Sequence, residues 1–320
     1  MADTVKAHQL ATPAEIEELN PEIVGADYDV QLESLSQWQL AWRRFKRHRM
    51  AVIGSTLFLT MVAIAIFGPI LVPYDFYKAP PPDEIVYAGR PPSIARPFGE
   101  TGGLQRDVFA LVINGVRWSM LIGVLATVIS SVIGTIVGGV AGYFGGFLDT
   151  VLMRIVDALL ALPLLFVILV FTKFLGAGNW FTVMIIFALF GWLGIARLVR
   201  SVMLSLREED YVDAARAAGV SSARIIFRHL LPNSLSPIIV AATLGVAGVI
   251  IGEAFVSFLG FGVDIQTPTL GNTLNGALTF ISVGNWWWAF FPGMAIVIIV
   301  LGINFMGDGL RDALDPRARI

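Results

Sequence analysis

Few side chains in this sequence are suited to covalent or metal chemistry. The chain has no cysteine, and its three histidines are scattered (His8, His48 and His229). This pattern excludes disulfides, thiolate metal sites and cysteine nucleophiles, and it gives no histidine cluster for a metal. A Walker A loop requires a lysine directly after a glycine, and none of the four lysines has one (Lys6, Lys46, Lys78 and Lys173). We therefore predict that the chain is not an enzyme and has no nucleotide site, metal or cofactor of its own.

Three ionisable residues lie inside long apolar stretches. Arg154 and Asp157 are three residues apart, so they share one helix face and can pair there. Glu253 stands alone in a later stretch. An ionisable group within a membrane span is by default a functional position that faces a water-filled path. The alternative for Glu253 is a carboxyl group satisfied by serine, backbone or a neighbouring arginine.

The composition indicates that the stretches carrying these charges lie in a membrane. The chain is 56% hydrophobic and only 14% charged, which is outside the usual soluble range. About 20 apolar residues cross the hydrocarbon core. Six stretches are long enough, near 50–72, 118–141, 151–173, 179–200, 235–258 and 287–307. The sequence thus predicts an all-α integral membrane protein with six transmembrane helices.

The distribution of basic residues predicts the orientation. With both termini in the cytoplasm, sixteen of the 22 Lys and Arg residues fall on the cytoplasmic side. Cytoplasmic segments carry the excess of positive charge in such proteins. We therefore expect an N-in, C-in topology in which the polar stretch 209–233 is cytoplasmic.

The stretch 209–233 is a helix-forming polar island between apolar spans. Asp210 or Asp213 can cap a short helix with a narrow alanine face, which Gly219 would end in the left-handed conformation. A second short helix would begin at Ser221 and stop at Pro232. A slim helix of this kind fits a groove on a soluble partner; a merely structural loop is the alternative.

The remaining segments divide the chain into parts. Residues 1–37 form an acidic cytoplasmic tail, either solvated or regulatory, and 38–72 combine an amphipathic segment with the first span. An external proline-rich loop follows at 73–112. The transmembrane core extends over 113–310, and a cytoplasmic tail covers 311–320.

Two features are expected to organise the core. Gly134, Gly138, Gly142 and Gly146 recur at every fourth position, so another helix can approach closely, either within the chain or from a second subunit. Trp286, Trp287 and Trp288 begin the sixth span, where aromatic residues anchor helices at the membrane interface.

The polar island resembles the EAA loop of binding-protein-dependent ABC importer permeases. That pattern is Glu-Ala-Ala, three residues, Gly, nine residues and Ile-x-Leu-Pro. Here Ala214, Ala215, Gly219, Leu231 and Pro232 match it, while Asp213 replaces the Glu and His229 the Ile. The resemblance extends from about 38 to 317 and is greatest to the C-type subunits of dipeptide, oligopeptide and nickel importers. It includes Arg106-Asp107, the stretch 257–263 and the tail 307–317. Before Arg106 the chain departs from the usual Gly-Thr-Asp-x-x-Gly.

The resemblance implies a type I ABC importer permease fold with a cytoplasmic coupling helix. It implies a permease subunit that moves di- or oligopeptides across a bacterial or archaeal plasma membrane by alternating access. Its partners would be a second homologous permease, an extracytoplasmic solute-binding protein and two ATPase subunits that bind ATP and Mg²⁺. The ATPase-coupling residues would be Asp213, Ala214, Ala215, Arg216, Gly219, Leu231 and Pro232. Glu253 would face the translocation pathway and meet the amino end of a peptide.

Other functions are compatible with parts of the sequence. The same motifs suit a permease for a nickel chelate, glutathione or an oligosaccharide. An autonomous ion-coupled carrier would need a relay of buried charges, for which only Arg154, Asp157 and Glu253 are available, and the sequence shows no inverted repeat. An intramembrane hydrolase would need a histidine or cysteine constellation that the sequence lacks.

Overall fold

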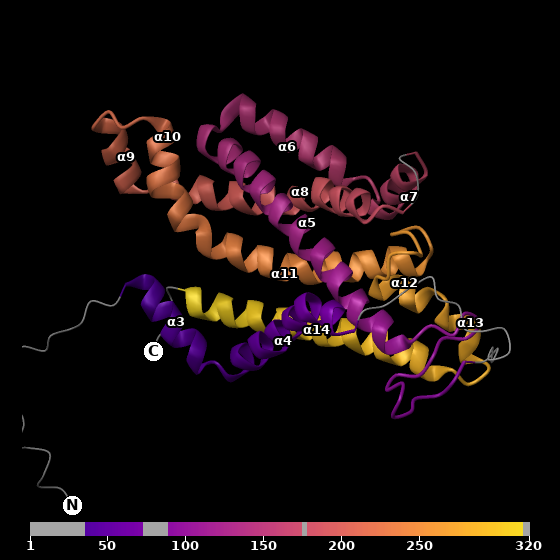
Figure 1. Cartoon of the computed structure of the whole chain (residues 1–320). Coiled ribbons are helices and arrows are strands. Elements are labelled where there is room, and N and C mark those ends of the chain that lie inside the picture. Colours follow the sequence, from indigo (N-terminus) through magenta and orange to yellow (C-terminus); the bar gives the residue numbers. More distant parts are fainter. Residues whose placement is uncertain (1–35, 73–88, 175–177, 316–320) are drawn as a thin grey trace, which may run out of the picture. The chain divides into compact units, whose positions relative to one another are not determined.

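The computed structural model describes residues 36–72, 89–174 and 178–315. The chain divides into two units, Met1–Leu40 and Ala41–Ile320, of which the first is described only from residue 36. In the described ranges the secondary structure is helical, and no strand forms (Figure 1). The helices are α3 (Gln37–Arg47), α4 (Arg49–Leu71), α5 (Val108–Phe144), α6 (Gly146–Leu160), α7 (Leu164–Phe174), α8 (Trp180–Leu206), α9 (Asp210–Ala217), α10 (Ser222–Ile225), α11 (Leu231–Phe258), α12 (Leu270–Asn275), α13 (Ala277–Ile281) and α14 (Trp286–Leu314).

The predicted membrane helices are present in the described ranges. Five helices are long and apolar enough to cross a membrane: α4, α5, α8, the continuous helix Ser222–Phe258 and α14. The third predicted span, 151–173, is wrong as a single straight helix. It consists of α6 and α7, which meet at a 77° bend. Pro163 lies in the break, and proline both lacks an N–H and disfavours helical conformation at the residue before it.

The second span begins ten residues earlier than predicted. Asp107 is the N-cap of α5, and its carboxylate accepts a hydrogen bond of 2.8 Å from the backbone N–H of Phe109. Such a cap satisfies a donor that the helix itself leaves unpaired. The last residues of the predicted loop 73–112 are therefore helical, while residues 73–88 lie outside the described residues.

The core consists of helices packed through small residues. The most extensive helix pair is α5 with α8, and α11 packs against both α5 and α14 (Figure 1). A Cβ added to Gly138 would lie 2.3 Å from the carbonyl oxygen of Ala196, and one added to Gly142 would lie 2.6 Å from Cβ of Met203. Gly134 is equally confined against Ile195. Of the two alternatives, a close approach within the chain is therefore confirmed for these three glycines.

The fourth glycine of the series behaves differently. Gly146 lies beyond the corner between α5 and α6, and a Cβ there would meet nothing within 4 Å. Its φ of +57° instead fits the corner itself, because glycine tolerates a left-handed backbone without steric cost. The expectation that all four glycines form one packing stripe is therefore wrong for Gly146.

We predict that Gly138→Ala destabilises the bundle by about 1–3 kcal/mol, because the added methyl group overlaps the Ala196 carbonyl and must separate α5 from α8. Thermal unfolding of the purified protein measures the effect. Gly139→Ala is the matched control, since its Cβ would be 3.9 Å from the nearest neighbour, Cε of Met203. Equal stability of the two variants would contradict this account of the α5–α8 contact.

Candidate functional site

Helix α9 is anchored on one side and exposed on the other. Val212 is fully buried in a cluster with residues of α5, α8 and α10, and Ala215 packs against the same cluster. Arg216 Nη1 donates a 3.0 Å hydrogen bond to Asp213 Oδ1, and its guanidinium lies 5.7 Å from the ring centroid of Tyr143 on α5. Four exposed residues of α9 are small or acidic and share one face: Asp210, Asp213, Ala214 and Ala217. Tyr211 and Arg216 are exposed beside them.

The turn after α9 depends on Gly219. Its φ is +76°, and the N–H of Val220 donates to the carbonyl of Ala215 at 3.1 Å. This closes the helix in the left-handed manner predicted from the sequence. The predicted cap is wrong, however. Glu209 occupies the N-cap position of α9, and no side chain caps the helix there.

Helices α9 and α10 and the turn between them form a hairpin. The second helix of this hairpin does not stop at Pro232. Residues Ser222–Phe258 form one helix of 37 residues that contains a π-helical turn at Ile226–Leu230. Pro232 is the second residue after this turn, at the start of α11. A proline is tolerated there because the wider π turn already departs from the regular hydrogen-bond ladder that proline would break. The hairpin is thus continuous with the fifth membrane helix.

Glu253 lies far along this helix and is fully buried. Its Oε1 accepts a hydrogen bond of 2.7 Å from Ser257 Oγ, and its Oε2 accepts one of 3.0 Å from Ser119 Oγ on α5. Each serine oxygen in turn accepts a backbone N–H, from Val263 at 3.2 Å and from Leu270 at 3.1 Å. The carboxyl group therefore joins α5 and α11 to both ends of the segment 263–270.

The segment 263–270 is closed by a second set of hydrogen bonds. Nδ2 of Asn272 donates to the carbonyl oxygens of Val263, Asp264 and Thr267 at 2.9–3.0 Å. Gly262 must be glycine, since a Cβ there would lie 2.1 Å from Ser257 Oγ. No sequence signal had linked Asn272 or Ser119 to Glu253. Whether Glu253 also faces the pathway stays a prediction, because in this chain alone its carboxyl group is enclosed.

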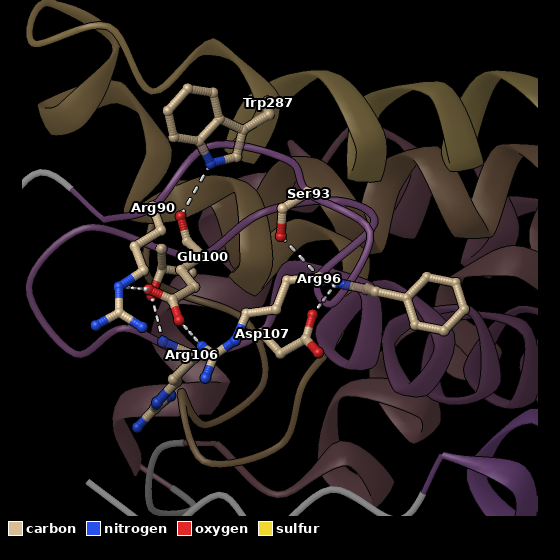
Figure 2. A network of polar contacts seen from close by, with 9 residues as sticks. Arg90, Ser93, Arg96, Glu100, Arg106, Asp107 and Trp287 are labelled. Carbon is tan, nitrogen blue, oxygen red and sulfur yellow. Dashed lines mark hydrogen bonds and ion pairs between the residues drawn. The ribbon is translucent and has the colours of Figure 1, made fainter. Parts of the chain in front are cut away.

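Another buried carboxylate organises the segment before α5 (Figure 2). Glu100 is 1% exposed, forms an ion pair with Arg96, and lies 4.0 Å from Nε of Arg90. Its backbone carbonyl accepts a 2.9 Å hydrogen bond from the indole of Trp287. Trp288 similarly donates to the carbonyl of Thr273.

Trp287 and Trp288 are buried, and their hydrogen bonds hold the segments that contain Glu100 and Thr273. The prediction that all three tryptophans anchor the sixth span at the interface is wrong for these two, whereas Trp286 is exposed.

Comparison with known sequences and structures agrees with these features. Residues 131–320 match the family described as the binding-protein-dependent transport system inner membrane component. The chain belongs to this family of transport permeases. Residues 36–91 match the N-terminal transmembrane domain of oligopeptide transport permease C.

Two relatives from Bacillus subtilis (strain 168) align over nearly the whole chain. The dipeptide transport system permease protein DppC is 39% identical over 91% of this chain and 89% of its own. The oligopeptide transport system permease protein OppC is 37% identical over 91% and 93%. Among solved structures, the inward-facing MetNI methionine ABC transporter matches with a TM-score of 0.53 and 22% identity. The match covers 64% of this chain and 96% of the MetNI chain, and the two chains share the fold.

Two arginines of α8 and a third directly after it, Arg207, hold the hairpin end of the permease together. Arg200 forms a bidentate ion pair with Asp149 of α6, and Arg207 Nη1 donates to the carbonyl of Gly142 at 3.2 Å. Arg197 pairs with Asp157 of α6. The predicted pairing of Asp157 with Arg154 is therefore wrong. A tertiary contact with the neighbouring helix takes precedence over the local spacing on α6.

We predict that Ser119→Ala weakens the segment 263–270 of the permease by about 1–3 kcal/mol, because it removes a donor to Glu253 and the acceptor for the Leu270 N–H. Hydrogen exchange at the Leu270 amide and thermal unfolding measure this loss. Ser131→Ala is the control, since within the described part of the chain that hydroxyl bonds only to the Thr127 carbonyl of its own helix. Unchanged protection of Leu270 in Ser119→Ala would refute the role of the network.

Proposed function

We propose that this chain is a permease subunit of an ATP-driven, binding-protein-dependent ABC importer that translocates di- or oligopeptides by alternating access. The names of its relatives support peptides over a nickel chelate, glutathione or an oligosaccharide. The observation that carries the mechanism is the exposed small-residue face of α9 on a firmly anchored hairpin. ATP and Mg²⁺ would bind to separate subunits, in keeping with the missing Walker A sequence.

In this proposal α9 is the coupling helix. An ATPase groove receives the face formed by Asp213, Ala214 and Ala217, while Val212 and Ala215 fix α9 to the bundle. Arg216 braces α9 against Tyr143, and Gly219 sets the turn. Leu231 and Pro232 continue the hairpin into α11.

The continuous helix Ser222–Phe258 transmits the motion. At 1.5 Å per residue it is about 55 Å long, and it connects the hairpin to Glu253 near its far end. Movement of the hairpin would therefore reach the segment 263–270 without a flexible joint. Rigid-body movement of packed helices is a common basis of such transitions.

The proposed arrangement places both termini and the hairpin in the cytoplasm of a bacterial or archaeal cell, as the basic residues indicate. A second homologous permease would complete the translocation pathway, and two ATPases would contact the hairpins. The external segments 89–107 and 260–275 would receive the solute-binding protein. The polar networks around Glu100 and Glu253 support this role, because they give both segments a fixed shape.

We predict that Gly219→Val lowers peptide uptake and ATPase co-purification by roughly tenfold or more, because a β-branched residue opposes the left-handed backbone that closes the hairpin. Gly219→Asn is the matched control, since asparagine tolerates this conformation. Space is not limiting for either variant, because a Cβ at Gly219 would meet nothing within 4 Å. Normal uptake by Gly219→Val would show that the hairpin is not the lever.

We also predict that Ala214→Trp abolishes association with the ATPases and uptake, while Ala214→Ser retains both. Ala214 is exposed, so a large indole fills the proposed groove without disturbing the core beneath α9. Co-purification of the ATPases and uptake of labelled dipeptide measure the effect, and membrane yield monitors insertion. Full assembly of the Ala214→Trp complex would overturn the docking assignment.

A further inference from the structure

The ion pair between Asp157 and Arg197 lies in an unusual place. Both residues belong to predicted membrane spans, yet their side chains are 52% and 51% exposed. Arg154, on the same part of α6, is also exposed, and no ion pair or hydrogen bond connects it to another described residue. Glu253, by contrast, is fully enclosed.

Along the axis of the bundle, the Asp157–Arg197 pair lies well away from the corner between α5 and α6. Arg207 contacts Gly142 and lies beside Gly145, so the end of α8 and the corner between α5 and α6 are at the same level. At 1.5 Å per residue, Asp157 is about 16 Å along α6 from this corner and Arg197 about 15 Å along α8. The hydrocarbon core is about 30 Å thick. The two charges therefore lie near its middle if these helix ends mark its boundary.

A charged face at this depth is unfavourable next to lipid. Ionisable side chains in membrane spans face a bundle interior or a water-filled cavity. Contact with a second permease would bury Arg154 as well, and a buried charge requires a partner. Water satisfies all three charges without such a partner.

We propose that the Asp157–Arg197 pair lines the water-filled translocation path and offers paired charges to a passing zwitterionic peptide. Asp157 would attract the peptide ammonium group, and Arg197 its carboxylate. The pair neutralises itself when the path is empty, so neither charge holds the peptide permanently. This inference rests on the proposed function and adds a site to it.

Because the chain has no cysteine, a single introduced thiol can be labelled selectively. Ala158→Cys places a single thiol of this chain beside the pair, at an exposed position, with both charges intact. Val132→Cys is the control. Val132 is 55% exposed at a similar distance from the corner, in an uncharged stripe of α5 with Leu125, Val128 and Ile136.

In the assembled transporter, membrane-impermeant methanethiosulfonate reagents should label Ala158→Cys about tenfold faster than Val132→Cys, because only a hydrated thiol ionises and reacts. Labelling should slow when dialanine, the binding protein and ATP are present. Equal rates at the two positions, or no labelling of Ala158→Cys with or without nucleotide, would overturn the proposal.

A second measurement tests whether Asp157 and Arg197 face the same water as the thiol at position 158. The quantity measured is the ratio of the labelling rates of Ala158→Cys with an anionic and a cationic reagent. Asp157→Asn should raise this ratio by roughly three- to fivefold, and Arg197→Gln should lower it by a similar factor. An unchanged ratio in both variants contradicts the proposal. Peptide uptake by the unmodified complex tests the proposed function separately, so failure of labelling with normal uptake would refute the path site alone.

Discussion

The arrangement of this permease depends on one constraint, the absence of water around its membrane helices. A polar group that lipid surrounds cannot be hydrated, so each must find a partner within the protein. Asp149 finds Arg200, and Glu253 finds Ser119 and Ser257. These pairings connect α6 with α8 and α5 with α11. The few polar groups in the spans thus contribute to which helices are neighbours, while apolar side chains and glycines fill the contacts.

The same constraint explains how the two ends of the molecule are connected. A helix satisfies its own backbone, so Ser222–Phe258 can extend from the hairpin to the far end of the bundle without a break. At one end Val212 and Arg216 attach α9 to the bundle. At the other end Glu253 holds two serines that fix the segment 263–270. A displacement of the hairpin is therefore mechanically connected to the opposite face.

Much of this architecture could be predicted because its signals are local. Apolar runs indicated the spans, the regular glycines indicated a close helix contact, and Gly219 indicated a left-handed turn. Contacts between distant segments could not be predicted in this way. The spacing of Arg154 and Asp157 suggested a local pair, but α8 supplies Arg197 instead. Pro232 suggested a helix end, but the π turn before it accommodates the proline. The serines around Glu253 carry no pattern of their own, since serine is common in such helices.

The two acidic residues that the sequence singled out in the spans differ in surroundings, and this difference separates their roles. Both oxygens of the Glu253 carboxyl group accept hydrogen bonds from serines that are themselves bonded to backbone N–H groups. A solute could reach it only by displacing this network and loosening the segment 263–270. Asp157 pairs with Arg197 alone among the described residues, and half of its side chain is exposed. It can exchange that partner for a solute charge without disturbing the fold. A path that must release its cargo favours such an exchangeable pair over a fixed one.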